Sequence, residues 1–346
     1  MNIQYSKPNI VMDDEDIRAI RDILNGGWVS IGKYVLQLED FVKKETGVKH
    51  VFACSNATTG LIIAIKAAGI RNKRVAVQPF TWPSTVYALE CNGNEPVWCD
   101  IDNSKWLMDY NKLDKLSVDA VLGVDVFGNK FELPERKNDL IIDAAHGWGI
   151  PGLGKRAKIE VVSLSFTKIV TGCEGGLILT NDDYCANICK ELRRLSSRLE
   201  EVNAYIALKI LTKDYLSFIE HRRELVRAYK RLILAPIEFQ DLSPVGEDNW
   251  NHSVFSVRFK EMAVRDSVLK GLTKEGVEVK TYYEPIVSAP VSNKVYSETI
   301  SLPIHKDMTI GTVEHVSGII NKYSNSSDTS PGRSYMETIG YLGKFV

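Results

Sequence analysis

The sequence predicts an α/β protein built on a mainly parallel β-sheet with helices on both faces. Between residues 50 and 180, short apolar runs alternate with segments whose apolar residues recur at helical spacing. The runs are apolar almost throughout, which is typical of strands buried on both faces. A chain of 346 residues is also long enough for a large domain that carries a smaller one.

The strands and helices of the large domain are expected in a regular order. Strands are predicted at VFACS (51–55), RVAVQ (74–78), EPVWCDID (95–102), AVLGVDVFG (120–128), DLIIDAA (139–145), VVSLSF (161–166) and GGLILTN (175–181). Helices are predicted between the first strands, at TTGLIIAIKAAGI (58–70) and STVYALECNG (84–93). Ligands of such open sheets bind beyond the carboxyl ends of the strands.

The second half of the chain predicts a connecting helix and a small α/β domain. From Tyr184 to about Leu234 the pattern is helical and highly charged, as in a long helix that crosses between domains. NHSVFSVRFK (251–260) is expected to be a strand, AVRDSVLKGLTKEG (263–276) a helix, and VEVKTYYEP (277–285) a further strand. The predicted units are a large domain with its connecting helices (1–234), a small C-terminal domain (235–323) and a Ser/Asn/Gly/Pro-rich tail (324–346).

Composition excludes several classes of function. Forty-three Lys and Arg against 44 Asp and Glu leave a net charge of −1, so no global field attracts nucleic acid or an anionic membrane. The N-terminal residues lack the features of a signal peptide, and no apolar run approaches the ~20 residues that span a bilayer, which predicts a cytoplasmic protein. The six scattered cysteines indicate neither a disulfide framework nor a metal site.

Lys168 is the most informative residue for function. It lies in SLSFTKIVTGCEGG (163–176), between an apolar strand and a glycine-rich turn that lets backbone approach a ligand closely. A lysine at a strand end inside a pocket is partly desolvated, which lowers its pKa and frees the amine to attack a carbonyl. The alternative is a solvated surface lysine. The context favours Schiff-base chemistry with pyridoxal phosphate.

Pyridoxal phosphate requires a carboxylate for its pyridine nitrogen, an aromatic surface and donors for its phosphate. Asp143 ends a strand, where an unpaired carboxylate is costly to bury, so it is expected to be the pyridine partner; a helix cap is the alternative. His146 is a candidate for a hydrogen bond to the phenolic oxygen, although a lone histidine is more often structural. Trp82, in a loop after the second strand, is a candidate for stacking on the ring, although tryptophan is more often a core residue.

Hydroxyl groups at two strand ends are candidate phosphate ligands. Thr58 and Thr59 open the helix after the first strand, where backbone N–H groups and the helix dipole favour an anion. Plain N-capping of that helix explains the same residues equally well. Ser163 supplies a further hydroxyl. Neither a GxGxxG nor a Walker pattern is present in the sequence, so a nucleotide cofactor is not indicated.

These motifs resemble the DegT/StrS-type sugar aminotransferases, a branch of the fold-type I pyridoxal phosphate enzymes. The similarity extends from GGWVSIGKYVLQLEDFV (26–42) to SLPIH (301–305), nearly the whole chain. The blocks between them follow the family order: CSNATTGLIIAIKAAGI (54–70), PFTWPSTVYAL (79–89), PVWCDID (96–102), VDVFGN (124–129), IIDAAHGWG (141–149), SLSFTKIVTGCEGG (163–176), HRRELVRAYKRL (221–232) and YYEPI (282–286).

The resemblance implies a role for each candidate residue. Lys168 is implied as the lysine that binds pyridoxal 5'-phosphate covalently and, once released, moves a proton between substrate and cofactor. The implied cofactor contacts are Asp143, His146, Trp82, Thr58, Thr59 and Ser163. The implied substrate contacts are Arg198, Tyr283 and His305. The site of the family lies between subunits, which implies a homodimer.

The sequence departs from the family pattern at three places. Ala57-Thr58 stands where Gly-Thr is usual, and Cys173-Glu174-Gly175-Gly176 stands for Gly-Glu-Gly-Gly. Leu195-Ser196-Ser197-Arg198 replaces a Gly-Tyr-Asn-Tyr-Arg block whose asparagine reaches the cofactor phosphate of the neighbouring subunit. Sugar 3-dehydratases of the family carry histidine in place of the lysine, so Lys168 argues against that activity.

The implied reaction moves an amino group from L-glutamate to a nucleotide-linked keto-deoxysugar, for O-antigen, lipopolysaccharide or a related glycan. The DAAHG and VDVFGN motifs look more like enzymes that act at C4 of dTDP-4-keto-6-deoxyglucose than at C3. A C3 keto-sugar or aminocyclitol transaminase shares the cofactor motifs. A catalytically inactive pyridoxal phosphate-binding or regulatory homologue is the rival outside the enzymes.

Overall fold

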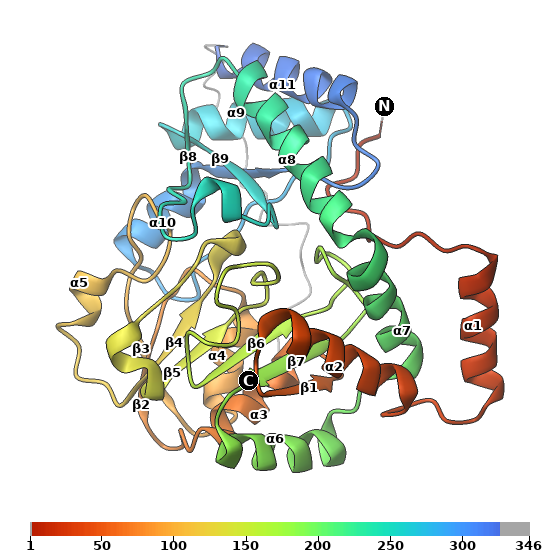
Figure 1. Ribbon diagram of the computed structural model, residues 1–346. Coiled ribbons are helices and arrows are strands. Elements are labelled where there is room, and N and C mark those ends of the chain that lie inside the picture. Colours follow the sequence, from red (N-terminus) through yellow and green to blue (C-terminus); the bar gives the residue numbers. More distant parts are fainter. Residues whose placement is uncertain (1, 326–346) are drawn as a thin grey trace, which may run out of the picture.

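A seven-stranded sheet forms the centre of the protein (Figure 1). The computed structural model describes residues 2–325, without the side chains of residues 137 and 138. In space the strands follow the order β1-β7-β6-β5-β4-β2-β3. Their bounds are β1 His50–Cys54, β2 Arg74–Val77, β3 Glu95–Trp98, β4 Ala120–Val124, β5 Leu140–Asp143, β6 Ile159–Ser163 and β7 Gly176–Thr180. Only β7 runs antiparallel to its two neighbours, which confirms the predicted mainly parallel sheet.

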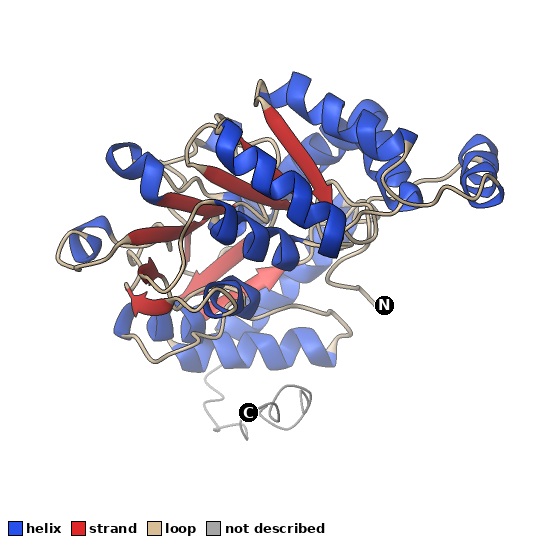
Figure 2. Ribbon diagram, turned by 90° about the horizontal axis from the view of Figure 1, so that it is seen from below, coloured by secondary structure: helices blue, strands red, loops and turns tan. Residues whose placement is uncertain are grey.

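Helices cover both faces of this sheet (Figure 2). Alternate residues of β1 enter different cores: Val51 and Ala53 join one apolar cluster, whereas Phe52 and Cys54 join the other. The helices of the large sheet are α2 Lys33–Thr46, α3 Ala57–Ala67, α4 Pro83–Glu90, α5 Tyr110–Leu113, α6 Asp183–Ser196 and α7 Glu201–Lys209. Because both faces are buried, the strands are mainly apolar, as their sequences indicated.

The connection after α6 differs from the predicted long helix. The chain leaves the helical conformation after Ser196, resumes as α7, passes through a π-helical turn at Ile210–Asp214 and continues as α8 Tyr215–Leu232. A contact with a distant segment accompanies the break, because the Glu201 carboxylate accepts N–H groups at the start of α2, including that of Gly32 at 2.8 Å. Charged residues that look helical in sequence thus serve a tertiary contact at the break.

A smaller antiparallel sheet, in the order β10-β9-β8, packs with a second apolar core above the first (Figure 1). Its strands are β8 Ile237–Phe239, β9 Phe255–Phe259 and β10 Thr299–Leu302, and its helices are α9 Met262–Lys274, α10 Pro290–Glu298 and α11 Ile310–Ser324. The strand predicted at 277–285 is wrong. That segment makes only isolated bridges, Ile3 with Val277 and Lys280 with Ser301, because it pairs with a different partner at each end.

The remaining described elements lie outside these layers. Helix α1 (Asp14–Asn25) stands beside α7, at the right of Figure 1. Short 3-10 turns occupy Val126–Gly128, Pro134–Asp139 and Glu247–Asn249. Among the described helices none is both long and apolar enough to cross a bilayer. From residue 326 on, the predicted tail lies outside the described residues.

Candidate active site

A cavity of about 450 Å³ lies where the carboxyl ends of the parallel strands meet residues of the smaller sheet. Such a volume is typical of sites for small ligands, which span ~300–1,000 Å³. Eight of the ten site residues predicted from the sequence line the cavity: Thr58, Trp82, Asp143, His146, Ser163, Lys168, Tyr283 and His305. They come together because parallel strands end at a common edge of the sheet.

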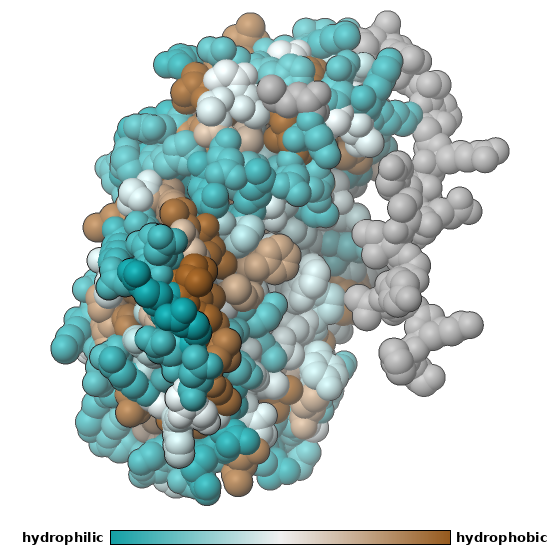
Figure 3. All heavy atoms as spheres, turned by 90° about the vertical axis from the view of Figure 1, so that its right-hand side faces the viewer, coloured by the Kyte–Doolittle hydropathy of each residue, from teal (hydrophilic) through white to brown (hydrophobic). Residues whose placement is uncertain are grey.

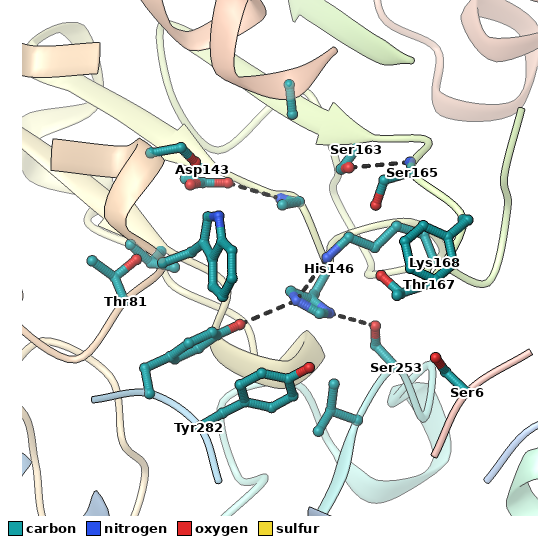
Figure 4. A pocket seen from close by; sticks show the side chains of 18 of the residues that line it. Ser6, Thr81, Asp143, His146, Ser163, Ser165, Thr167, Lys168, Ser253 and Tyr282 are labelled. Carbon is teal, nitrogen blue, oxygen red and sulfur yellow. Dashed lines mark hydrogen bonds between the residues drawn. The ribbon is translucent and has the colours of Figure 1, made fainter. Parts of the chain in front are cut away.

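Lys168 and His146 form the centre of the site (Figure 4). The Lys168 Nζ lies 2.9 Å from the His146 Nε2. Burial lowers the pKa of Lys168 to about 8, against the opposing charges of Asp143 and Glu174. Burial, with the charges of Lys168 and Arg222 in addition, lowers the pKa of His146 well below its usual value. The imidazole is therefore neutral at physiological pH, and the amine loses its proton more readily than that of a solvated lysine.

The contacts of His146 indicate its tautomer. The Tyr283 hydroxyl lies 3.2 Å from the same Nε2, and burial raises the pKa of Tyr283, so the phenol keeps its proton and donates it. A ring nitrogen that accepts from two donors carries no proton of its own. The proton thus resides on Nδ1, which donates to the Ser253 Oγ at 2.6 Å.

Asp143 is a buried carboxylate held by neutral groups. Its Oδ2 accepts from the Thr85 hydroxyl at 2.7 Å, and its Oδ1 accepts from the Ala145 N–H at 3.1 Å. Burial raises the pKa of Asp143, against these hydrogen bonds and the charge of Lys168. Among residues 2–325 no Lys, Arg or His is within ion-pair distance of this carboxylate. A buried carboxylate of this kind is stabilised by a cation in the cavity.

Two of the predicted phosphate ligands lie at the cavity and one does not. Thr58 and Ser163 are lining residues. Thr59 lies outside the lining: its N–H donates to the Asn56 Oδ1 at 2.8 Å, which is a helix cap, and its Oγ1 lies 2.7 Å from the Ser197 Oγ. The hydroxyl that reaches this helix start from the altered block is therefore Ser197, whereas the Ser196 hydroxyl donates to the Leu192 carbonyl on the surface.

The aromatic and substrate candidates differ in their surroundings. Trp82 is the N-cap residue of α4 and keeps 57% of its surface exposed, so a ring face is free for a ligand. His305 donates from Nε2 to the Gln4 carbonyl at 3.0 Å and accepts the Asp307 N–H at Nδ1, which leaves both of its ring nitrogens occupied. Arg198 is exposed and is not a lining residue of the cavity in this single chain.

Sequence reasoning missed several residues of the cavity wall. Arg222, Tyr5, Tyr282 and Ser253 all line it. Arg222 was visible only as part of the HRRELVRAYKRL block, and the segment of Ser253 was predicted as a plain strand. Tyr5 reaches the site from the N-terminus, which no local pattern indicates.

The described residues fit pyridoxal phosphate. Asp143 supplies a buried carboxylate, and the protonated pyridine nitrogen of the cofactor would compensate its negative charge. Lys168 supplies an amine of lowered pKa, and Trp82 an exposed ring at the same cavity. The hydroxyl groups of Thr58 and Ser163 are at the cavity, where they can donate hydrogen bonds to the cofactor phosphate.

Several solved structures share this fold. The chain superposes on DesI, solved in the presence of its TDP-sugar product, with a TM-score of 0.84, 24% identity and coverage of 93% of both chains. It superposes on PseC of Helicobacter pylori, described as an aminotransferase of pseudoaminic acid biosynthesis, with a TM-score of 0.83, 22% identity and coverage of 93% and 99%. The putative sugar aminotransferase Spr1654 of Streptococcus pneumoniae, in its PMP form, gives a TM-score of 0.85, 18% identity and coverage of 94% and 98%.

The profile of a protein family also matches the chain, over residues 11–321. That range includes both sheets and the cavity residues from Asn56 to His305. It confirms the predicted fold-type I class and an enzyme that uses pyridoxal phosphate for transamination. The chain belongs to the DegT/DnrJ/EryC1/StrS aminotransferase family.

Proposed function

We propose that the protein transfers an amino group from L-glutamate to a nucleotide-linked keto-deoxysugar, with dTDP-4-keto-6-deoxyglucose as the first candidate acceptor. The observation that carries the proposal is the half-buried pair of Lys168 and neutral His146, 2.9 Å apart, in a cavity shared with Asp143. The description of DesI names a TDP-sugar product, which supports a thymidine-linked sugar as acceptor. O-antigen or lipopolysaccharide biosynthesis and a cytoplasmic location stay predictions from the sequence.

The residues of the cavity divide the chemistry between them. Pyridoxal phosphate supplies, when bound, a ring that withdraws electrons from the substrate carbon. Asp143 would hold a proton on the pyridine nitrogen, and Thr85 and Ala145 keep its carboxylate in place. Lys168 would hold the cofactor and would move a proton at the substrate carbon, for which a pKa near the working pH is favourable.

His146 and Tyr283 control the state of the amine. The unprotonated His146 Nε2 accepts a hydrogen bond from the Lys168 amine and so directs its lone pair away from the imidazole. Tyr283, 3.2 Å from the same nitrogen, lines the cavity and holds the Nε2 side of the imidazole in place. Both groups are uncharged at neutral pH, so neither competes with Asp143 for a cationic ligand.

Mass analysis of products tests the proposed reaction. The protein is incubated with pyridoxal phosphate, L-glutamate and, separately, dTDP-linked 4-keto and 3-keto sugars and a keto-cyclitol. We expect the 4-keto sugar to gain an amino group, and Lys168→Ala to lose both the product and the absorbance of the bound cofactor. Amination of the 3-keto sugar or of the cyclitol instead would reassign the acceptor. A wild-type protein that takes up the cofactor but yields no 2-oxoglutarate from glutamate would be an inactive homologue.

A homodimer is part of the proposal. The site of the family lies between subunits, and Arg198 lies outside the cavity of a single chain. Apolar side chains on the N-terminal segment support it: Val11, Ile17, Leu24, Trp28 and Val29 are all exposed. Figure 3 views the side on which α1 lies and shows apolar side chains gathered in a band on this face. Apolar patches of this kind mark protein contacts.

A further inference from the structure

Arg222 of α8 is a buried cation in the cavity wall. Its exposed fraction is 5%, and its Nη1 donates to the carbonyl oxygens of His252 and Ser253, each at 3.1 Å. Its Nε is buried without a hydrogen-bond partner. No carboxylate among residues 2–325 forms an ion pair with its guanidinium, and the only opposing group near its charge is the Tyr5 phenol.

Other buried arginines of the protein are compensated. Arg156 pairs with two carboxylates, Asp125 and Glu160. In the same way Arg193 pairs with Glu39 at 3.0 Å, and Arg258 pairs with Glu298 at 2.7 Å. A buried charge without a partner is costly, so its retention in a cavity wall points to an anion that arrives from outside.

The pKa values of Arg222 and of the histidines near it indicate that the charge of Arg222 is not compensated. Burial lowers the pKa of Arg222 itself to about 10. Burial also lowers the pKa of His146, His252 and His305, and the guanidinium lowers each of them further. The surroundings of Arg222 therefore hold its positive charge among imidazoles of lowered pKa, of which His146 and His305 line the cavity.

Two residues, Ser253 and His146, connect Arg222 to the reacting amine. Ser253 accepts from Arg222 at its carbonyl oxygen, and its hydroxyl accepts from His146 at 2.6 Å. His146 in turn lies 2.9 Å from the Lys168 Nζ. An anion bound by the guanidinium would thus lie close to the place where an amine of the substrate reacts.

We propose that Arg222 binds a carboxylate of the amino-acid donor and so selects an acidic donor. This inference rests on the proposed transamination. The planar guanidinium matches a carboxylate through paired N–H donors, and Arg222 has unused donors. The diphosphate of a nucleotide sugar is the other oxyanion of the reaction. The short connection to Lys168 favours the donor, whose carboxylates are only a few bonds from its amino group.

Titration calorimetry on the cofactor-loaded protein separates the two anions. Glutarate, a dicarboxylate that cannot react, represents the donor, and thymidine diphosphate represents the acceptor. We expect Arg222→Gln to weaken glutarate binding by about 10- to 100-fold, as for the loss of a charge-assisted hydrogen-bond pair, and to leave thymidine diphosphate within about twofold. Arg222→Lys keeps the positive charge but lacks the paired N–H donors of the guanidinium, so it should lose an intermediate part of the affinity for glutarate.

The matched control is Arg223→Gln, one residue along the same helix, where the side chain pairs with Glu220 instead. It should bind glutarate as the wild type does. Unchanged glutarate binding in Arg222→Gln would overturn the proposal, as would a loss that affects thymidine diphosphate alone. If Arg222→Gln does not fold, Arg222→Lys decides, and a wild-type protein that does not bind glutarate overturns the proposal without any variant. If Arg222→Gln loses glutarate binding but the wild type aminates none of the keto-sugars, the role of Arg222 stands and the proposed sugar acceptor is wrong.

Discussion

Asp143 carries the buried negative charge on which the proposed reaction depends. In Asp143→Asn the amide keeps the size of the side chain but cannot hold a proton on the pyridine nitrogen. We expect turnover to fall by about 10- to 100-fold while the protein still binds the cofactor, because Lys168 is untouched. Steady-state kinetics with the absorbance of the bound cofactor measures both. Thr85→Val removes one hydrogen bond to the carboxylate but not its charge, and a loss in that control as large as in Asp143→Asn would contradict the role of the charge.

The pKa of Lys168 predicts how cofactor uptake depends on pH. Only the neutral amine attacks a carbonyl, and burial brings its pKa to about 8, so the neutral fraction rises as pH increases through that value. In protein stripped of cofactor, the rate of covalent uptake should rise from pH 7 to about 9 and then level off. A stopped-flow absorbance series measures the midpoint. His146→Ala opens the wall to water and should shift the midpoint upward; a wild-type midpoint near the ordinary 10.5 would show that the amine is not desolvated.

Residues next to strand ends could be predicted from the sequence, and residues brought in from afar could not. Asp143 ends a buried strand and Lys168 follows one, which is a local pattern. Thr59 lies one position from a lining residue but turns its hydroxyl to Ser197, a contact across 138 positions of sequence. Arg222 gives no local sign, since a charged residue in a charged helix resembles its exposed neighbours.

At the scale of elements, Arg156 joins the end of β4 to β6. Its Nη2 lies 2.8 Å from Asp125 and 2.5 Å from Glu160, and all three side chains are at most 2% exposed. Arg156→Met leaves two carboxylates buried without a cation, so the free energy of unfolding should fall by about 3–5 kcal/mol. Urea denaturation measures the change. Arg194→Met breaks an exposed pair with Glu191 and should cost less than about 1 kcal/mol; equal losses in the two variants would show that the buried cluster contributes nothing special.

The strands were predictable and the charged connections were not. Each strand of the large sheet is short and mainly apolar, and every predicted strand from residue 51 to 181 overlaps an observed one. The segment after α6 kept its helical pattern in sequence, yet the chain breaks where Ser197 contacts the start of α3 and Glu201 that of α2. The spacing of apolar and polar residues along the sequence indicates which side of an element is buried. The breaks between helices depend instead on hydrogen bonds between distant segments.

At the scale of the whole molecule, the cavity is a joint product of two sheets. The large sheet supplies Lys168 and Asp143, while Tyr283 and Ser253 come from the segments around the smaller one. The family order of motifs made this arrangement predictable, because each motif follows a strand of known place. The part that the N-terminus plays was not predictable, since the segment of Tyr5 is held by contacts with distant residues, including the bridge of Ile3 with Val277 and the hydrogen bond of His305 to Gln4.

The exposed face of helix α1 is the surface through which we expect two chains to associate. Its inner side is tied to the body by Asp16, which contacts Tyr205 and Lys209, whereas Ile17 and Leu24 on the helix are each 58% exposed. We expect the wild type to be a dimer at micromolar concentration, and Ile17→Glu with Leu24→Glu to raise the dissociation constant by about 100-fold or more, because two carboxylates would be desolvated at the interface. Sedimentation velocity measures the association. Leu234→Glu places the same charge at an 83% exposed position just beyond the end of α8 and should leave the dimer intact.

A monomeric wild type would contradict the homodimer, whereas a double variant that stays dimeric would place the contact elsewhere. If Arg198 completes the site from a second chain, the monomeric variant should also lose turnover while it still binds the cofactor through Lys168.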